Sequence, residues 1–480
     1  MEEIVAAAMA ELREGLVEIE ERGAALFEVS GAEFGDKRLN NRYPKVLGQM
    51  MKMPQAPLNQ SADCLSEMHA AYRFISNKKV TVEKLLEPHR NQIAKRAQGA
   101  PMVLAIQDMT RFDLSDHLTM KGLKPSSPGK IARALCFHTA LFALPNGLPL
   151  GIGYLESYSG KKECAVERVR AGKWMDEKIT GRWLRAIDAG EELFEQGTRV
   201  IWLSDRESDI YEVLHHIEGV GKEFVIRARV SRGIEEGPHH DTDRALEAAP
   251  VVHRFELKVR GNFKGVARTA QVELRYIKAT ITVPLSRMAF VERNTVATSV
   301  VEVREVNAAE NVEPLHWQLI TNLPVTNVSE AVGIVELYAR RWAIEEVFKI
   351  LKSGCRADRA QFQTIERFTK YVALSLIVAW RIYYLVHINR VAPEAPAESV
   401  VTRAELETLQ LLLDAKRKER KMRRVIIKTA NQVITEVAKL GGYLNRKSDP
   451  CPGTVVLWRG TMALAVATMT FLARKSLDML

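Results

Sequence analysis

The sequence predicts an α/β protein in which a central domain, with a mixed sheet and a β-rich insertion, is flanked by a helical N-terminal domain and a helical C-terminal region. From residue 101, short apolar runs alternate with helix-like segments, which is typical of a mixed α/β sheet. Residues 230–310 instead alternate polar and apolar side chains, which predicts inserted strands. We expect domains at 1–98, at 99–390 with the insertion at about 230–315, and at 391–480.

Composition limits the size class and the partners. The 480 residues exceed one ordinary core and suggest roughly two to four domains. A content of 46% hydrophobic and 27% charged residues is normal for a soluble folded protein. The net charge of +10 favours a polyanionic partner, because lysine and arginine release condensed counterions when they bind phosphate backbones. Charge alone leaves nucleic acid and an acidic membrane as alternatives.

Cysteine usage and apolar runs indicate the compartment. The five cysteines are scattered and form no CxxC pair, which favours a reducing compartment and argues against a zinc site. Residues 1–21 are acidic and amphipathic, whereas a secretion signal is basic and then apolar. The longest apolar run, 371–380, is too short to span a bilayer and predicts a buried helix. We therefore expect a cytoplasmic protein with no membrane contact.

The first 98 residues have helix signals and many cations. Two segments, GDKRLNNR at 35–42 and AYRFISNKK at 71–79, mix basic residues with the asparagine and aromatic side chains that contact phosphates and bases. A solvated basic face has the same composition, so DNA binding and plain solvation both stay open. The cations of interest are Lys37, Arg38, Arg42 and Arg73.

Apolar runs in the central domain predict buried strands, and two of them end in an aspartate. The runs cover 102–108, 134–145, 148–156, 199–205 and 223–229, with helix-like segments at 183–194 and 208–216. Asp108 and Asp205 end the first and fourth runs, where α/β proteins place their chemistry. Each could instead form a turn or cap a helix, although Ser208 or Asp209 can cap the helix after Asp205.

A further polar cluster lies at 338–352, within a stretch that predicts one continuous helix. Asn327 and Glu330 form a candidate capping box before it, and Gly354 follows its last apolar residue as a stop. Four side chains would share one face within about 60° of arc. They are Tyr338, Arg341, Glu345 and Lys352. The alternative is a solvated face of ion pairs beside a core stripe.

The two strand-end aspartates and the helix glutamate together suggest metal-dependent phosphodiester chemistry. Asp108, Asp205 and Glu345 supply hard oxygen ligands that can hold two Mg²⁺ ions about 3.5–4 Å apart. One ion would activate water or a 3′-hydroxyl, and the other would stabilise the leaving oxygen. The neighbouring phenol, guanidinium and ammonium suit phosphate binding.

These motifs resemble the signature of bacterial cut-and-paste DDE transposases, in particular insertion-sequence family four, to which the transposon-five transposase belongs. The resemblance is carried by Asp108 in AIQDMT, Asp205 in DRESD and the Y-x2-R-x3-E-x6-K spacing at 338–352. The segments at 35–42 and 71–79 resemble that family's end-binding domain, and 440–460 resembles its dimerisation region. One departure is Met109, because the family commonly has threonine after the first aspartate.

The resemblance implies a ribonuclease-H-like catalytic core in which Asp108, Asp205 and Glu345 bind two Mg²⁺ ions, with Mn²⁺ able to substitute. It also implies that Trp317 stacks a base flipped out of the duplex, although a core aromatic in a strand is the alternative. The implied DNA contacts are Tyr338, Arg341, Lys352, Arg227, Arg206, Lys37, Arg38, Arg42 and Arg73.

The implied function is DNA transposition, in which the element is excised through hairpin ends and joined to target DNA. The implied partner is a second copy, so that a homodimer pairs two ends in a synaptic complex at the bacterial nucleoid. Two alternatives are a Mg²⁺-dependent nuclease without strand transfer and a catalytically silent DNA-binding regulator. No Walker-type glycine loop is present, so ATP use is not expected.

Three smaller sequence features can each be explained either by a structural role or by a functional one. His239, His240 and Asp241 lie in a polar loop flanked by glycine and proline, which favours a turn over a metal site. KRKERKMRR at 416–424 is either a DNA contact or a solvated helix face. VAPEAPAES at 391–399 is typical of a linker before the C-terminal helices.

Overall fold

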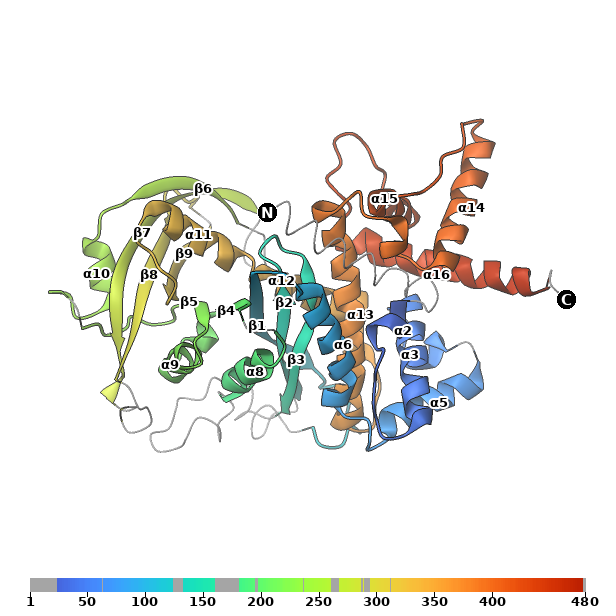
Figure 1. The fold of residues 1–480 in the computed structure, drawn as a ribbon, viewed down its shortest axis with the longest axis horizontal. Coiled ribbons are helices and arrows are strands. Elements are labelled where there is room, and N and C mark those ends of the chain that lie inside the picture. The colour runs from blue at the N-terminus through green and yellow to red at the C-terminus, as the bar shows by residue number, and fades with distance from the viewer. Residues whose placement is uncertain are drawn as a thin grey trace.

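A computed structural model describes residues 24–477, apart from 63, 124–132, 160–180, 195–196, 236, 260–266, 286–287, 289–293 and 311. The acidic segment 1–21 and Cys164, one of the five cysteines, lie outside the described residues. One large sheet runs through the described part, and N-terminal helices in blue and C-terminal helices in orange and red gather beyond one of its edges (Figure 1).

The sheet combines parallel and antiparallel strands. Its strands are β1 (Met102–Asp113), β2 (Ala134–Ala143), β3 (Pro149–Ser159), β4 (Arg199–Ser204), β5 (Glu223–Arg227), β6 (His253–Val259), β7 (Arg268–Thr282), β8 (Thr295–Glu305) and β9 (His316–Thr321). Among the described residues their order is β3-β2-β1-β4-β5-β9-β8-β7-β6. The β1–β4 and β4–β5 pairs are parallel, and the other neighbours are antiparallel.

Helices cover the sheet and form both ends of the described part of the chain. The N-terminal helices are α2 (Ala24–Glu28), α3 (Lys37–Lys52), α4 (Leu58–Ser61), α5 (Leu65–Ser76) and α6 (Val82–Ala97). The central helices are α8 (Arg182–Glu191), α9 (Tyr211–Gly219), α10 (Thr242–Ala248), α11 (Val328–Ala339), α12 (Trp342–Lys349) and α13 (Ile365–Val391). The C-terminal helices are α14 (Arg403–Glu419), α15 (Ala430–Leu440) and α16 (Thr454–Leu477).

The strand pattern of the sequence is confirmed, with one difference in the length of β1 and one in the pairing of the insertion. The five apolar runs form β1 to β5, and the helix-like segments between them form α8 and α9. β1 is longer than its run, because it keeps pairing with β2 as far as Asp113. The insertion is β-rich as predicted, but it is not a separate sheet: β9 pairs with β5, so β8, β7 and β6 extend the central sheet.

Alternate side chains of β1 enter two different cores, because successive residues of a strand point to opposite faces. Val103 and Ala105 pack in the core beneath α8 and α9. Leu104 and Ile106 pack in the larger core that includes α12 and α13. Asp108 continues this even-numbered series, so its carboxylate lies on the α12 side of the sheet.

A long buried helix, α13, lies in the larger core. All residues of 371–380 are buried, which confirms the predicted buried helix. By length and composition alone, two helices of the described part, α13 and α16, could cross a membrane. The apolar window of α13 is 89% buried inside the protein, against 33% for α16. Burial identifies α13 as a core helix.

The segment 391–399, the predicted linker, lies between α13 and α14 and is packed against the protein. Ala395 and Ala397 are buried. The carbonyl of Ala395 accepts from Ala430 N at 2.7 Å, and Ala397 N donates to the Lys428 carbonyl at 2.9 Å. Small alanine side chains let this Pro-rich segment pack against the start of α15.

A buried ion network joins α2, α6 and the β3 edge of the sheet. The carboxylate of Glu28 accepts from Arg96 at 2.8 and 2.9 Å and pairs with Nδ1 of His89. Nε2 of His89 accepts from Ile152 N at 2.8 Å, so we assign a neutral imidazole with its proton on Nδ1. The Arg96 guanidinium lies 4.4 Å from the Trp380 ring on α13. The network ties the N-terminal helices to the central domain.

We expect acid to weaken this junction. Burial raises the pKa of Glu28, but the charge of Arg96 and the hydrogen bonds outweigh burial and lower the pKa from 4.5 to about 2. A depressed carboxyl pKa stabilises the fold above the unfolded value, so this contribution is lost as pH falls from about 4.5 to about 2.

Glu28→Gln should therefore lower the free energy of unfolding at neutral pH by about 3 kcal/mol and flatten the acid limb of the stability profile. Thermal unfolding across the acidic range measures both effects. Glu83→Gln, on the exposed face of α6, is the control. An acid limb equally steep in Glu28→Gln and wild type would contradict the assignment.

Candidate active site

The carboxyl ends of β1 and β4 bring two aspartates side by side. The parallel pairing of these strands ends at Ile106 and Leu203, and Asp108 and Asp205 lie two residues further on. Asp108 is not at the end of its strand as predicted, because β1 continues along β2 with Asp108 opposite Thr139. The prediction that both aspartates follow the ends of strands is correct only for the parallel pairing of β1 with β4, which ends before Asp108 and Asp205.

Asp205 caps the 3₁₀ turn that follows β4. Its Oδ1 accepts a hydrogen bond from Glu207 N at 2.9 Å. The expectation that Ser208 or Asp209 would serve as the cap is wrong. Asp209 is buried and paired with Arg232 at 2.6 Å, and the Ser208 hydroxyl donates to the Asp205 carbonyl at 2.9 Å.

The predicted continuous helix through 338–352 is two helices, α11 and α12, followed by a π-helical turn at Ile350–Gly354. At the junction, the N–H groups of Arg340 and Arg341 bond to carbonyls three residues back, which tightens the chain and ends the regular α-helix. The predicted start is confirmed, because Asn327 Oδ1 accepts from Glu330 N at 3.0 Å. The helical stretch ends at Gly354 as predicted.

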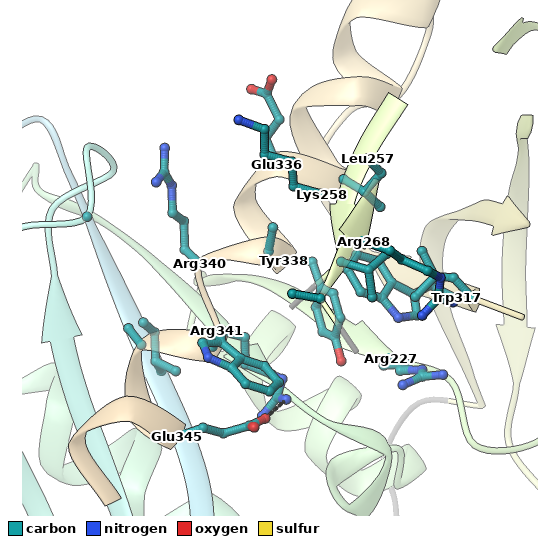
Figure 2. A pocket seen from close by; sticks show the side chains of 18 of the residues that line it. Arg227, Leu257, Lys258, Arg268, Trp317, Glu336, Tyr338, Arg340, Arg341 and Glu345 are labelled. Atoms are coloured by element: carbon teal, nitrogen blue, oxygen red, sulfur yellow. Dashed lines mark hydrogen bonds and ion pairs between the residues drawn. The ribbon is translucent and has the colours of Figure 1, made fainter. Parts of the chain in front are cut away.

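Arg341, at this junction, joins two of the carboxylates. Its Nη1 lies 2.8 Å from Oδ2 of Asp108, and its Nη2 pairs with Glu345 (Figure 2). The guanidinium carbon lies 5.9 Å from the centroid of the Tyr338 ring. The other oxygen of Asp108 accepts from Met109 N at 2.7 Å. One cation therefore lies among two acids and a phenol.

Besides burial, the charges of Asp205 and Glu345 both affect the pKa of Asp108. Burial raises the pKa of Asp108 to about 7 against the opposing charge of Arg341. The nearby charges of Asp205 and Glu345 raise it further. Burial lowers the pKa of Arg341, but Tyr338, Asp108 and Glu345 outweigh burial and raise it above its usual range.

The donor set fits a divalent cation in its chemistry. Carboxylate oxygens are the ligands that Mg²⁺ takes, and burial first, followed by the charges of Asp205 and Glu345, raises the pKa of Asp108 in spite of Arg341. Within the described ranges, no three acidic, histidine or cysteine side chains converge closely enough to ligate one ion. The expected three-carboxylate group is not assembled here, because Arg341 is inserted between Asp108 and Glu345.

Glu345 opens onto a cleft of about 1170 Å³ between the central strands and the insertion. Trp317 on β9 and Tyr338 on α11 meet edge to face, with ring centroids 5.0 Å apart. Arg227 on β5 donates to the His316 carbonyl at 2.7 Å. Trp317, Tyr338 and Arg227 lie on one side of the cleft (Figure 2). Trp317 is half-buried, packed against the core and also lining the cleft.

Lys352 and Arg206 lie outside the lining of this cleft. Nζ of Lys352 is 5.4 Å from the centroid of the Phe112 ring, which is four residues beyond Asp108 on β1 and thus about 13 Å further along the strand. The π turn at Ile350–Gly354 changes the angular register between Glu345 and Lys352, and Lys352 lies beside Phe112 and outside the cleft lining. Arg206 is exposed beside Asp205.

Three cations that line the cleft were not predicted: Lys258, Arg268 and Arg340. Lys258 is exposed on β6, and Arg268 on β7 pairs with Glu305 at 2.6 Å. Arg340 is exposed at the α11–α12 junction. The alternating pattern of the insertion indicates which strand residues face outward, but not that this hairpin borders the cleft.

A basic groove of about 540 Å³ lies on the N-terminal helices between α3 and α5. Three of the predicted cations line it together with other polar side chains, whereas Lys37 is exposed at the start of α3 outside the lining. The polar lining consists of Arg38, Asn41, Arg42, Lys45, Arg73 and Asn77. Residues 35–42 and 71–79 are thus adjacent in space.

Two smaller motifs have structural explanations. Asp241 caps α10 by accepting from Arg244 N at 3.0 Å, so the loop of His239 and His240 leads into a helix start. Residues 416–424 run from the last turn of α14 into the following chain and are mostly exposed, as expected for a basic surface.

Three family models match successive parts of the chain. The transposase DNA-binding family matches residues 21–80, the transposase DDE domain matches 175–381, and the transposase Tn5 dimerisation domain matches 377–476. The DDE match includes Asp205 and Glu345 and begins after Asp108.

Among solved structures, a piggyBac transposase synaptic complex with hairpin DNA aligns at a TM-score of 0.34 and 9% identity, over 87% of this chain and 80% of that one. This likeness is too loose to carry an argument, so the assignment depends on the three family models. With DNA-binding, DDE and dimerisation segments in that order, the chain belongs to the DDE transposases related to the Tn5 transposase, enzymes that use divalent metal ions to cut DNA and join its strands.

Proposed function

We propose that Asp108, Asp205 and Glu345 are the catalytic carboxylates of this transposase. The observation that carries the proposal is the placement of two aspartates just past the paired ends of adjacent parallel strands, with Arg341 joining one of them to Glu345. The strand order β3-β2-β1-β4-β5, with β2 antiparallel, supports a ribonuclease-H-like core that carries β6 to β9 as its insertion.

The same carboxylates would hold two divalent ions, Mg²⁺ in our proposal, with Mn²⁺ able to substitute. When bound, such ions lower the pKa of an attacking water or 3′-hydroxyl and neutralise charge on the leaving oxygen. β1 and β4 orient the aspartates, and α12 orients Glu345. Arg341 would no longer be needed to neutralise Asp108 and Glu345 when divalent ions are bound to them. Its planar guanidinium could then donate two hydrogen bonds to a phosphate.

Tyr338 and several cations of the central domain would hold the DNA backbone near the element's end. The proposed contacts there are Tyr338, Arg341, Arg227, Lys352 and Arg206. The basic groove between α3 and α5, extended by Lys37, would bind the end repeats through Arg38, Arg42 and Arg73. Phosphate contacts of this kind set register and salt dependence rather than base preference.

The proposed reaction is four displacements at phosphorus. Water cuts one strand at the element's end, and the freed 3′-hydroxyl attacks the opposite strand to form a hairpin. A second water opens the hairpin, and the 3′-hydroxyl then joins to target DNA. Each step breaks one P–O bond as another forms, so one set of carboxylates serves all four.

Hairpin formation bends the DNA end sharply, and Trp317 would stack the base that leaves the duplex. Trp317→Ala should slow hairpin formation by about tenfold or more and leave the first nick nearly unchanged, because stacking is worth about 1–3 kcal/mol per base. Trp317→Phe should keep most of the rate. Denaturing gels separate the nicked and hairpin products, and an equal loss of both would contradict this role.

The proposed domains are 1–98 for end binding, 99–390 for catalysis and 391–480 for dimerisation. Several apolar side chains of α16 are exposed, including Val466, Met469 and Leu472, which suits pairing with a second copy. A homodimer would hold two ends in a synaptic complex. We propose the bacterial cytoplasm, at the nucleoid, as its location.

The experiment that tests this function is incubation of the purified protein with Mg²⁺ and a DNA fragment bearing the terminal repeats of its own element. Hairpinned and strand-transferred products support the full proposal. Nicked ends without hairpins would remove the hairpin steps. Nicking that ignores the repeats would favour a plain nuclease, and repeat-specific binding without cleavage would favour a silent regulator.

A further inference from the structure

A second cationic site lies at the end of the cleft away from Trp317. We call it the Gly147 corner, and it consists of Arg340, His387 and the β2–β3 turn at Gly147. A methyl group on the Gly147 Cα would lie 3.5 Å from Nη1 of Arg340 and 3.8 Å from Nδ1 of His387. Two nitrogen-bearing side chains, from the α11–α12 junction and from α13, therefore surround one point at the turn.

The conformation of the turn favours glycine at position 147, which leaves the space between the Arg340 and His387 side chains unfilled by a side chain of the turn. Gly147 has a φ of +93°, a conformation that favours glycine, and its N–H donates to the Leu144 carbonyl at 2.8 Å. Asn146 Oδ1 accepts from Leu148 N at 3.0 Å and closes the turn. A larger residue at position 147 would be strained and would place its Cβ between the two side chains.

Arg340 differs from Arg341 and Arg268, two other arginines of the cleft, in having no acidic partner. Arg341 pairs with Asp108 and Glu345, and Arg268 pairs with Glu305. Arg340 is exposed, and no carboxylate of the described residues is within ion-pair distance of it. Its guanidinium points away from Glu345 (Figure 2). An exposed arginine without an internal partner, at the edge of a cleft, is available to an external anion.

Arg340 and Trp317 lie on opposite sides of the cleft lining (Figure 2). Trp317 and Arg227 come from β9 and β5, whereas the corner follows the end of β2 at Ala143, which also lines the cleft. A strand-joining enzyme must hold DNA on both sides of the phosphate that reacts. The proposed function assigns the Trp317 side to the element's end, which leaves the corner for the other DNA.

We propose that the Gly147 corner binds a backbone phosphate of the DNA beyond the reacting phosphate, on the side away from the element's end. That phosphate belongs to flanking donor DNA before cleavage or to target DNA at joining. The guanidinium fork and an imidazole N–H both donate to phosphate oxygens. The contact adds affinity without reading sequence. This inference rests on the proposed function of the Trp317 side.

The test compares Arg340→Gln, Arg340→Lys and wild type in three assays: binding of end repeats, cleavage of ends with flanking DNA, and joining of precleaved ends to a target plasmid. Arg340→Gln should bind ends normally and need about tenfold more target DNA, or cleave flanked ends about tenfold more slowly. For the affected step, we plot the logarithm of the apparent DNA affinity against the logarithm of the salt concentration. The slope of this plot should become shallower by about one, as expected for one lost phosphate contact. Arg340→Lys should restore part of the loss.

Arg403→Gln, an exposed arginine on α14, controls for the lost charge, and matching thermal unfolding of all variants controls for folding. A loss confined to joining identifies target DNA, and a loss confined to cleavage identifies the flank. Unchanged cleavage and joining, or an equal loss of end binding, overturns the proposal and leaves the proposed function intact. A wild-type protein that joins no ends overturns both.

Discussion

Glu345→Gln should lower the rates of DNA cleavage and strand transfer together, by roughly 10³-fold or more, and leave the binding of end repeats unchanged. Glutamine keeps the size of the side chain but removes the charge that a divalent ion needs. Charge stabilisation by such an ion is worth several kcal/mol, and each 1.36 kcal/mol is about tenfold in rate. If one site performs every displacement, each step must lose activity to a similar extent.

The next residue provides a matched control. Glu346 lies on the same helix, accepts from Trp342 Nε1 at 3.3 Å and lies 4.0 Å from Lys349, and it makes no pair with Arg341. Glu346→Gln should therefore stay close to wild type when nicked, hairpin and joined products are quantified on gels. An equal loss in both variants would mean that α12 was disturbed, and an active Glu345→Gln would refute the assignment.

Much of the central fold followed from periodicity. Short apolar runs predicted β1 to β5 because a strand buried on both faces leaves that pattern, as Val103 and Leu104 illustrate by entering different cores. The alternating insertion predicted strands for the same local reason. The sequence could not tell that β9 pairs with β5 and continues the central sheet, because strand neighbours are set by distant pairing.

The sequence indicated which residues to consider for the site but not how they are arranged. Asp108, Asp205 and Glu345 were proposed by type and spacing. A uniform helix put Tyr338, Glu345 and Lys352 on one face, whereas the helix breaks at Arg340 and Arg341, and Lys352, in the π turn, lies beside Phe112. That break coincides with a contact between segments far apart in the chain, the pair between Arg341 and Asp108. Helical periodicity contains no information about such a contact.

Arg341→Gln should destabilise the metal-free protein, and more so in alkali than in acid. The pKa of Asp108 is raised from 3.8 to about 7, so the folded chain binds more protons than the unfolded chain between these values and its stability falls as pH rises through this range. Without Arg341, the charges of Asp205 and Glu345 act on Asp108 with less compensation. The added cost should be about 2 kcal/mol near pH 8 and smaller near pH 5.

If the three carboxylates bind divalent ions as proposed, Mg²⁺ supplies the charge that the substitution removes. Mg²⁺ should then raise the Tm of Arg341→Gln more than that of wild type, where an arginine already occupies the carboxylates and must be displaced. Thermal unfolding at about pH 5.5 and pH 8, with and without Mg²⁺ and without DNA, measures this competition. Arg340→Gln, one residue away and without a carboxylate partner, is the control for the lost charge. Equal Mg²⁺ shifts in all three proteins would mean that Arg341 and the ion do not share ligands. A larger shift in Arg341→Gln alone would mean that Arg341 and the ion compete for the same carboxylates, so that Arg341 compensates their charge only until metal binds.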